Sequence, residues 1–61
     1  MKRRELEQHL RKHGCVLERE SKHSIWKNPE FNVISAVPRH SEIPRGTVRA
    51  ICRDLRIPNP F

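Results

Sequence analysis

The chain has 61 residues and a formal net charge of +6, which is large for that length. So short a chain forms one domain that buries only about 60% of its unfolded surface, so we expect marginal stability. The charge predicts an anionic partner: nucleic acid, an acidic protein or a membrane surface. The membrane is the weakest of these, because no apolar run approaches the roughly 20 residues of a spanning helix and no signal peptide follows the basic start.

The two cysteines, Cys15 and Cys52, bear on compartment and on metal binding. Secreted domains of this size usually carry several disulfides, so two cysteines favour a reducing compartment, and we expect the cytoplasm. A zinc site of both cysteines with His23 and His40 is arithmetically possible but has no recognisable ligand spacing. Buried thiols acting as small apolar residues are the better interpretation, and we expect no metal and no cofactor.

The first half of the chain predicts a helix followed by two strands. Residues 2–13 contain no Gly, Pro or β-branched residue and carry Leu6 and Leu10 on one helical face, and Gly14 then ends the helix. Residues 15–20 and 23–28 predict strands joined by a hairpin through Ser21 and Lys22.

Alternation along residues 23–28 divides the second strand between two faces. Ser24 and Trp26 share one face, and His23, Ile25 and Lys27 share the other. Trp26 is expected to be the largest core residue, with base stacking as the less favoured role.

The second half predicts a turn, a third strand and a second helix. Residues 28–32 have turn chemistry, residues 33–37 are short and β-branched, and Pro38 ends that strand. After a loop, Pro44 is expected at the first helical position. Residues 58–61 form a short tail, because two prolines prevent the helix from continuing.

Two stripes run along the second helix. A buried stripe is expected at Val48, Ile51, Cys52 and Leu55. A basic stripe is formed by Arg45, Arg49 and Arg53, with Arg56 beside them. Only Asp54 offers an acid within this helix, so we weigh an anion contact evenly against a solvated helix face.

The element order is α-β-β-β-α in a single domain, residues 1–61. Two helices on one face of a three-stranded antiparallel sheet make an α+β two-layer fold. Within it, His23 stands between Lys22 and Lys27, so its titratable imidazole lies in a positive field where it could meet phosphate. An exposed turn histidine without a chemical role is the alternative.

Three stretches in this order resemble the HicA toxins of toxin–antitoxin pairs. The first is His13-Gly14-Cys15-Val16-Leu17 after the opening helix, and the second is Ser21-Lys22-His23-Ser24-Ile25-Trp26 with Lys27-Asn28-Pro29. The third is Val37-Pro38-Arg39-His40 followed by Ile43-Pro44-Arg45-Gly46-Thr47-Val48-Arg49-Ala50-Ile51, whose helix start is the most specific.

The resemblance implies a double-stranded-RNA-binding-domain-like fold and an mRNA interferase neutralised by a HicB-like antitoxin. His23 occupies the place of the family's catalytic histidine, although no glycine occurs between Arg19 and His23. His40 matches a histidine often seen after the third strand, without a clear catalytic role.

The implied reaction is metal-independent, because RNA carries its own nucleophile in the 2′-OH. His23 would act as the acid–base group, and Lys22, Lys27 and Arg39 are candidates for stabilising the phosphate, chosen by sequence proximity. Together with Arg45, Arg49 and Arg53 they form the expected RNA-binding set. The alternatives are a non-catalytic RNA-binding module of the same fold and a domain whose basic face docks an acidic protein.

Overall fold

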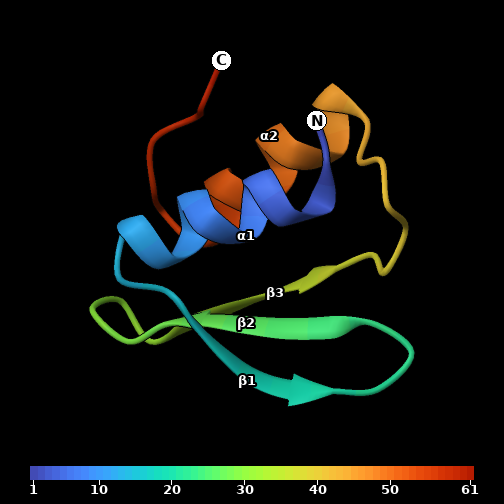
Figure 1. The fold of residues 1–61 in the computed structure, drawn as a ribbon. Coiled ribbons are helices and arrows are strands. Elements are labelled where there is room, and N and C mark those ends of the chain that lie inside the picture. The colour runs from blue at the N-terminus through green and yellow to red at the C-terminus, as the bar shows by residue number, and fades with distance from the viewer.

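A computed structural model describes all residues, 1–61, and confirms the α-β-β-β-α order. Its elements are α1 (Arg3–Lys12), β1 (Val16–Glu20), β2 (Ser24–Asn28), β3 (Val33–Val37) and α2 (Arg45–Asp54). The three antiparallel strands lie in the order β1-β2-β3. Both helices cover the same face of this sheet, so the predicted two-layer α+β fold is present (Figure 1).

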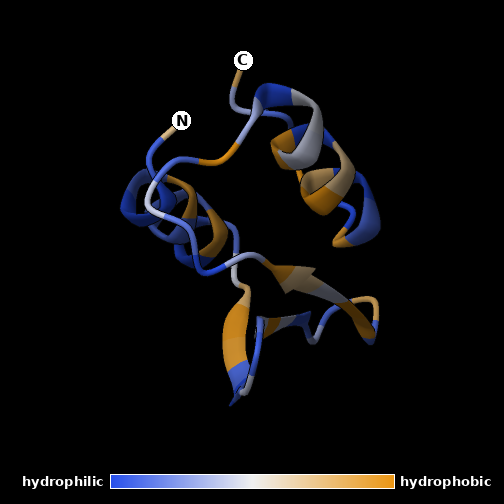
Figure 2. Ribbon diagram, turned by 90° about the vertical axis from the view of Figure 1, so that its right-hand side faces the viewer, coloured by the Kyte–Doolittle hydropathy of each residue, from blue (hydrophilic) through white to orange (hydrophobic).

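The core lies between the helices and the sheet. Its ten buried apolar residues come from both helices, from β2 and β3 and from the connecting segments: Leu6, Leu10, Cys15, Trp26, Val37, Ile43, Val48, Ile51, Cys52 and Leu55. Figure 2 shows the hydrophobic residues of the two helices turned toward the space between them. The expected core positions of Trp26 and of the apolar stripe on α2 are therefore confirmed.

The two cysteines are free and buried, as expected. Burial raises the pKa of both thiols, and for Cys52 the neighbouring Cys15 raises the pKa further. Both side chains are therefore neutral apolar groups of the core at physiological pH.

Alternation along β2 is as predicted from Ser24 onward. Ser24, Trp26 and Asn28 are buried under the helices, while Ile25 and Lys27 lie half-buried on the opposite face. Strand β1 is different, because it is an edge strand and all five of its residues are exposed. A bulge between Leu17 and Arg19 also shifts its register against β2.

Both helices end in the same hydrogen-bonded motif. At the end of α1, Cys15 N–H donates to Leu10 O (2.9 Å) and Gly14, at φ 85°, donates to Arg11 O (3.0 Å). After α2, Ile57 and Arg56 make the equivalent bonds to Cys52 and Arg53. This is the Schellman motif, in which the first residue past the cap takes a left-handed conformation. The prediction that Gly14 ends the first helix is confirmed.

Two expectations about α2 are corrected. Pro44 has φ −60° and ψ 149° and is the residue before the first helical turn, so the helix begins at Arg45. Arg56 lies outside the helix with φ 57°, because the Schellman motif turns the chain there. Its guanidinium lies 5.5 Å from the Phe31 ring centroid, so Arg56 does not extend the basic stripe.

Candidate nucleic-acid interface

His23 lies in the turn between β1 and β2 and is exposed. The ladder pairs Glu20 with Ser24, so Ser21, Lys22 and His23 form a three-residue loop. Ser21 N–H donates to His23 O (3.0 Å), which leaves Lys22 at the tip. The expectation that His23 belongs to the second strand is therefore wrong, because the last paired residues are Glu20 and Ser24 and His23 lies between them.

The end of the sheet that carries His23 also carries the segment after β3. Ser24 at the start of β2 pairs with Val37 at the end of β3, so Arg39 and His40 follow at the same end. Both are exposed. The sheet topology thus brings together Lys22, His23 and Arg39, which the sequence separates by up to 17 positions.

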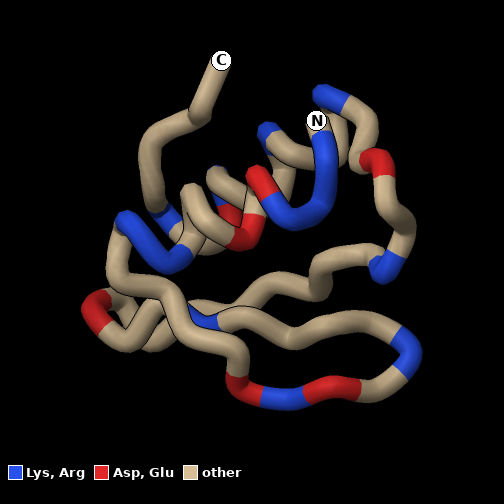
Figure 3. The backbone as a smooth tube through the Cα atoms, in the orientation of Figure 1, with Lys and Arg blue, Asp and Glu red and all other residues tan.

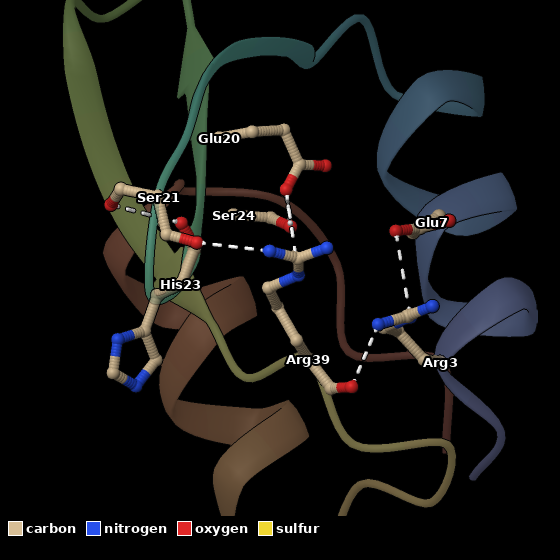
Figure 4. Close-up of polar contacts among 7 residues, drawn as sticks. All are labelled: Arg3, Glu7, Glu20, Ser21, His23, Ser24 and Arg39. Atoms are coloured by element: carbon tan, nitrogen blue, oxygen red, sulfur yellow. Dashed lines mark hydrogen bonds and ion pairs between the residues drawn. The ribbon is translucent and has the colours of Figure 1, made fainter.

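Arg39 contacts the His23 turn directly. Its Nη1 donates to the carbonyl oxygen of Ser21 (3.1 Å), and its Nε lies 3.6 Å from Glu20 Oε2. The same carboxylate oxygen of Glu20 accepts a hydrogen bond from buried Ser24 Oγ (3.2 Å). Figure 4 shows these contacts, with the His23 imidazole pointing away from the Arg39 guanidinium.

A second arginine, Arg3 of α1, contacts the loop after β3. Arg3 Nη1 donates to the carbonyl oxygen of Arg39 (2.8 Å), and Arg3 N–H donates to Ser41 O (2.9 Å). Arg3 Nε lies 3.9 Å from Glu7 Oε2 one turn along α1 (Figure 4). The start of α1 and the loop after β3 are therefore one connected unit beside the His23 turn.

Lys27 lies away from this end. It is four residues past His23, or roughly 13 Å at about 3.3 Å per strand residue. It is on the sheet face opposite the helices, and its Nζ lies 3.8 Å from Glu18 Oε1. Sequence proximity to His23 therefore does not become spatial proximity.

Arg45, Arg49 and Arg53 all lie exposed on α2. The guanidinium of Arg45 lies over the Phe61 ring, 4.5 Å from its centroid, while Arg49 and Arg53 make no ion pair. In Figure 3 the basic residues of the β1–β2 turn, of the loop after β3 and of the starts of α1 and α2 lie in the right half of the view. The acidic residues of the same segments, Glu20 and Glu42, are paired with Arg39 and with the N-terminal amine. This side can receive an extended polyanion.

The remaining histidines have structural contacts or none. His9 Nε2 lies 2.7 Å from Pro58 O and therefore contacts the tail, and the His9 ring packs against that of His13 with their centroids 4.6 Å apart. His40 makes no hydrogen bond.

Neither helix has the length and apolar character needed to cross a bilayer.

The comparison with protein families matches the chain to one class of protein. The family described as the HicA toxin of bacterial toxin–antitoxin matches residues 3–57, which include both helices and all three strands. The comparisons with curated proteins and with solved structures give no match. The molecule is thus a toxin of a toxin–antitoxin system. It belongs to the HicA toxin family, as the sequence motifs indicate.

Proposed function

We propose that this toxin is an endoribonuclease that cleaves mRNA with His23 as its acid–base group and is neutralised by a HicB-like antitoxin in the cytoplasm. The observation that carries the proposal is the exposed imidazole of His23 on the basic side of the molecule, one residue from Lys22. An imidazole can accept and donate a proton near neutral pH, and a positioned acid–base group contributes typically 10²–10⁴-fold to a rate.

The reaction follows from the chemistry of RNA. The 2′-OH of the ribose attacks the adjacent phosphorus, the bond from phosphorus to the 5′-oxygen breaks, and the products are a 2′,3′-cyclic phosphate and a 5′-hydroxyl. His23 takes the proton from the 2′-OH or gives one to the leaving 5′-oxygen. Charge on the phosphate is stabilised by nearby cations, and Lys22 is the nearest basic side chain along the chain. No metal is needed to generate the nucleophile.

Binding is attributed to the basic side of the molecule. Arg45 at the start of α2, with Arg49 and Arg53 further along the same helix, contacts phosphates of the RNA strand. Lys27 is paired with Glu18 on the sheet face opposite the helices and is not assigned a phosphate contact. An acidic antitoxin surface that covers His23 or this basic side would block the RNA and stabilise the toxin by mass action.

The test uses an RNA oligonucleotide cleaved by the isolated chain in the presence of EDTA. The proposal predicts fragments with 2′,3′-cyclic phosphate ends, and it predicts that a single 2′-deoxyribose at the cleavage position abolishes cleavage there. Binding of the oligonucleotide without any cleavage would instead support the alternative, a non-catalytic RNA-binding module of the same fold. Cleavage at the 2′-deoxy position would contradict the 2′-OH mechanism.

A further inference from the structure

The β1–β2 turn has no glycine and stands at the exposed edge of the sheet, and it makes hydrogen bonds both within itself and with a residue outside the hairpin. Within the turn, Ser21 N–H and Ser21 Oγ both donate to His23 O, at 3.0 and 3.5 Å. These two short-range bonds close the loop but do not fix it relative to the rest of the domain. Besides the strand ladder at its base, the turn is joined to the rest of the domain by contacts of Arg39.

Arg39 joins the turn to the body of the domain through two ends of the same residue. Its guanidinium donates to Ser21 O and lies beside Glu20, and its own carbonyl oxygen accepts from Arg3 of α1. A guanidinium presents several donors in a fixed plane, so one side chain can contact a carbonyl and a carboxylate together. Ser24 Oγ donates a hydrogen bond to the same carboxylate oxygen of Glu20 that faces Arg39.

We propose that Arg39 is a positioning residue for His23: it holds the β1–β2 turn in one orientation through Ser21 and Glu20, rather than binding RNA phosphate itself. The inference rests on the proposed function, in which His23 is the acid–base group. It assigns to Arg39 a role different from the phosphate contact that the sequence suggested. Its guanidinium already has an acceptor at 3.1 Å and a carboxylate at 3.6 Å.

Removing the Arg39 contacts is expected to change the orientation of the β1–β2 turn and not the free energy of unfolding of the domain. Arg39 and Glu20 are about half-exposed, and ion pairs of that kind contribute little to the free energy of unfolding. Misplacing a reacting group by about 1 Å, however, can lower a rate about 10²-fold. A variant without these contacts should therefore fold normally, bind RNA normally and cleave slowly.

The first experiment examines the protein without RNA. Amide hydrogen exchange and 15N relaxation of Ser21, Lys22 and His23 are compared between wild type, Arg39→Gln and Arg39→Lys. Arg19→Gln is the matched control, because Arg19 is exposed on the same hairpin and makes no ion pair or side-chain hydrogen bond. We expect faster exchange and greater mobility of the turn in Arg39→Gln, a smaller effect in Arg39→Lys and none in Arg19→Gln. An unchanged turn in Arg39→Gln overturns the proposal, whether or not the wild type cleaves RNA.

The second experiment separates positioning from phosphate binding. Single-turnover cleavage by Arg39→Gln should fall about 10–10²-fold while the affinity for RNA and its salt dependence stay at the wild-type values. Glu20→Gln should lower the rate less, and the double variant should be less impaired than the product of the two effects, because both act on one contact. Weaker binding with a salt slope reduced by about 0.7 and an unchanged rate would show that Arg39 contacts a phosphate, and would overturn the proposal. Failure of the wild type to cleave refutes the proposed function alone, since the turn measurement stands without it.

Discussion

Asn28 Nδ2 donates a 2.7 Å hydrogen bond to the carbonyl oxygen of Leu55, which joins the end of β2 to the end of α2 across the core. The side chain is buried, and its Oδ1 accepts from Glu30 N–H at 3.1 Å. Asn28 therefore satisfies one of the carbonyls left open at the end of α2 while shaping the turn before β3. It is the only side chain in the structure that hydrogen-bonds to the residue capping α2.

Asn28→Ala should lower the free energy of unfolding by about 1–3 kcal/mol, because the buried Leu55 carbonyl loses its donor. Asn28→Asp should cost more at neutral pH, since an ionised carboxylate would face that carbonyl. The new carboxyl would have a folded pKa above its unfolded value of about 3.9, so the loss relative to wild type should be smallest below about pH 4 and grow as the pH rises. Urea unfolding at several pH values measures both. Equal stability of Asn28→Asp and wild type at pH 7 would contradict the buried bond.

Trp26→Ala should cost about 3–5 kcal/mol, which is comparable to the whole stability of a small domain. Trp26 is fully buried, and its indole N–H has no hydrogen-bond partner. Trp26→Phe keeps most of the ring and removes that unsatisfied donor, so it should cost much less than the alanine variant. Circular dichroism during thermal unfolding compares them. Equal losses from both substitutions would show that the N–H is bonded and that packing is not the main contribution.

The two helix ends offer a paired test of backbone conformation. Gly14→Ala should lower the free energy of unfolding by about 1 kcal/mol, because alanine disfavours the positive φ at this position. The backbone conformation is the only cause, since nothing lies within 4 Å of the added Cβ. Arg56→Gly should be more stable than Arg56→Ala by about 1 kcal/mol, because both lose the contact with Phe31 and only glycine relieves the left-handed conformation. Denaturant midpoints give the comparison. If alanine at position 56 is as stable as glycine, the left-handed conformation is not populated in solution.

The basic stripe of α2 is tested by salt. Arg49→Glu combined with Arg53→Glu should reduce the slope of log affinity for single-stranded RNA against log salt by about 1.4, or about 0.7 for each lost phosphate contact. Lys12→Glu combined with Arg19→Glu changes the net charge equally at exposed residues outside the proposed interface, since Lys12 lies at the far end of α1. Equal changes in the two double variants would mean that net charge alone attracts the RNA and that the stripe is a solvated helix face.

Local patterns predicted the elements well but not the contacts that cross the fold. Alternation placed Trp26 in the core, and the 3.6-residue period placed Val48, Ile51 and Cys52 there, because burial follows directly from those periods. The same period wrongly carried Arg56 into the helix, since it contains no information about where the chain turns.

The contacts and positions that the sequence did not predict depend on pairing between distant segments. Asn28 reads as a turn residue in Asn28-Pro29, and nothing nearby in the sequence indicates that a helix end will present the Leu55 carbonyl to it. Alternation extends the second strand to His23, whereas the ladder ends at Ser24. Where it ends depends on the register of β1 against β2, including the bulge, and the alternation within one strand does not determine that register. The contact of Arg39 with Ser21 likewise follows from the strand order.

The central claim, that His23 carries out the chemistry, is tested most directly by single-turnover cleavage of one RNA oligonucleotide by His23→Ala. His40→Ala is the control, since it removes another exposed imidazole at the same end of the sheet. The account predicts a rate at least about 10²-fold lower for His23→Ala, with the melting temperature and RNA affinity unchanged, and a near wild-type rate for His40→Ala. Cleavage by His23→Ala within a few-fold of wild type would contradict the account, and an equal loss in both variants would require a mechanism with two histidines.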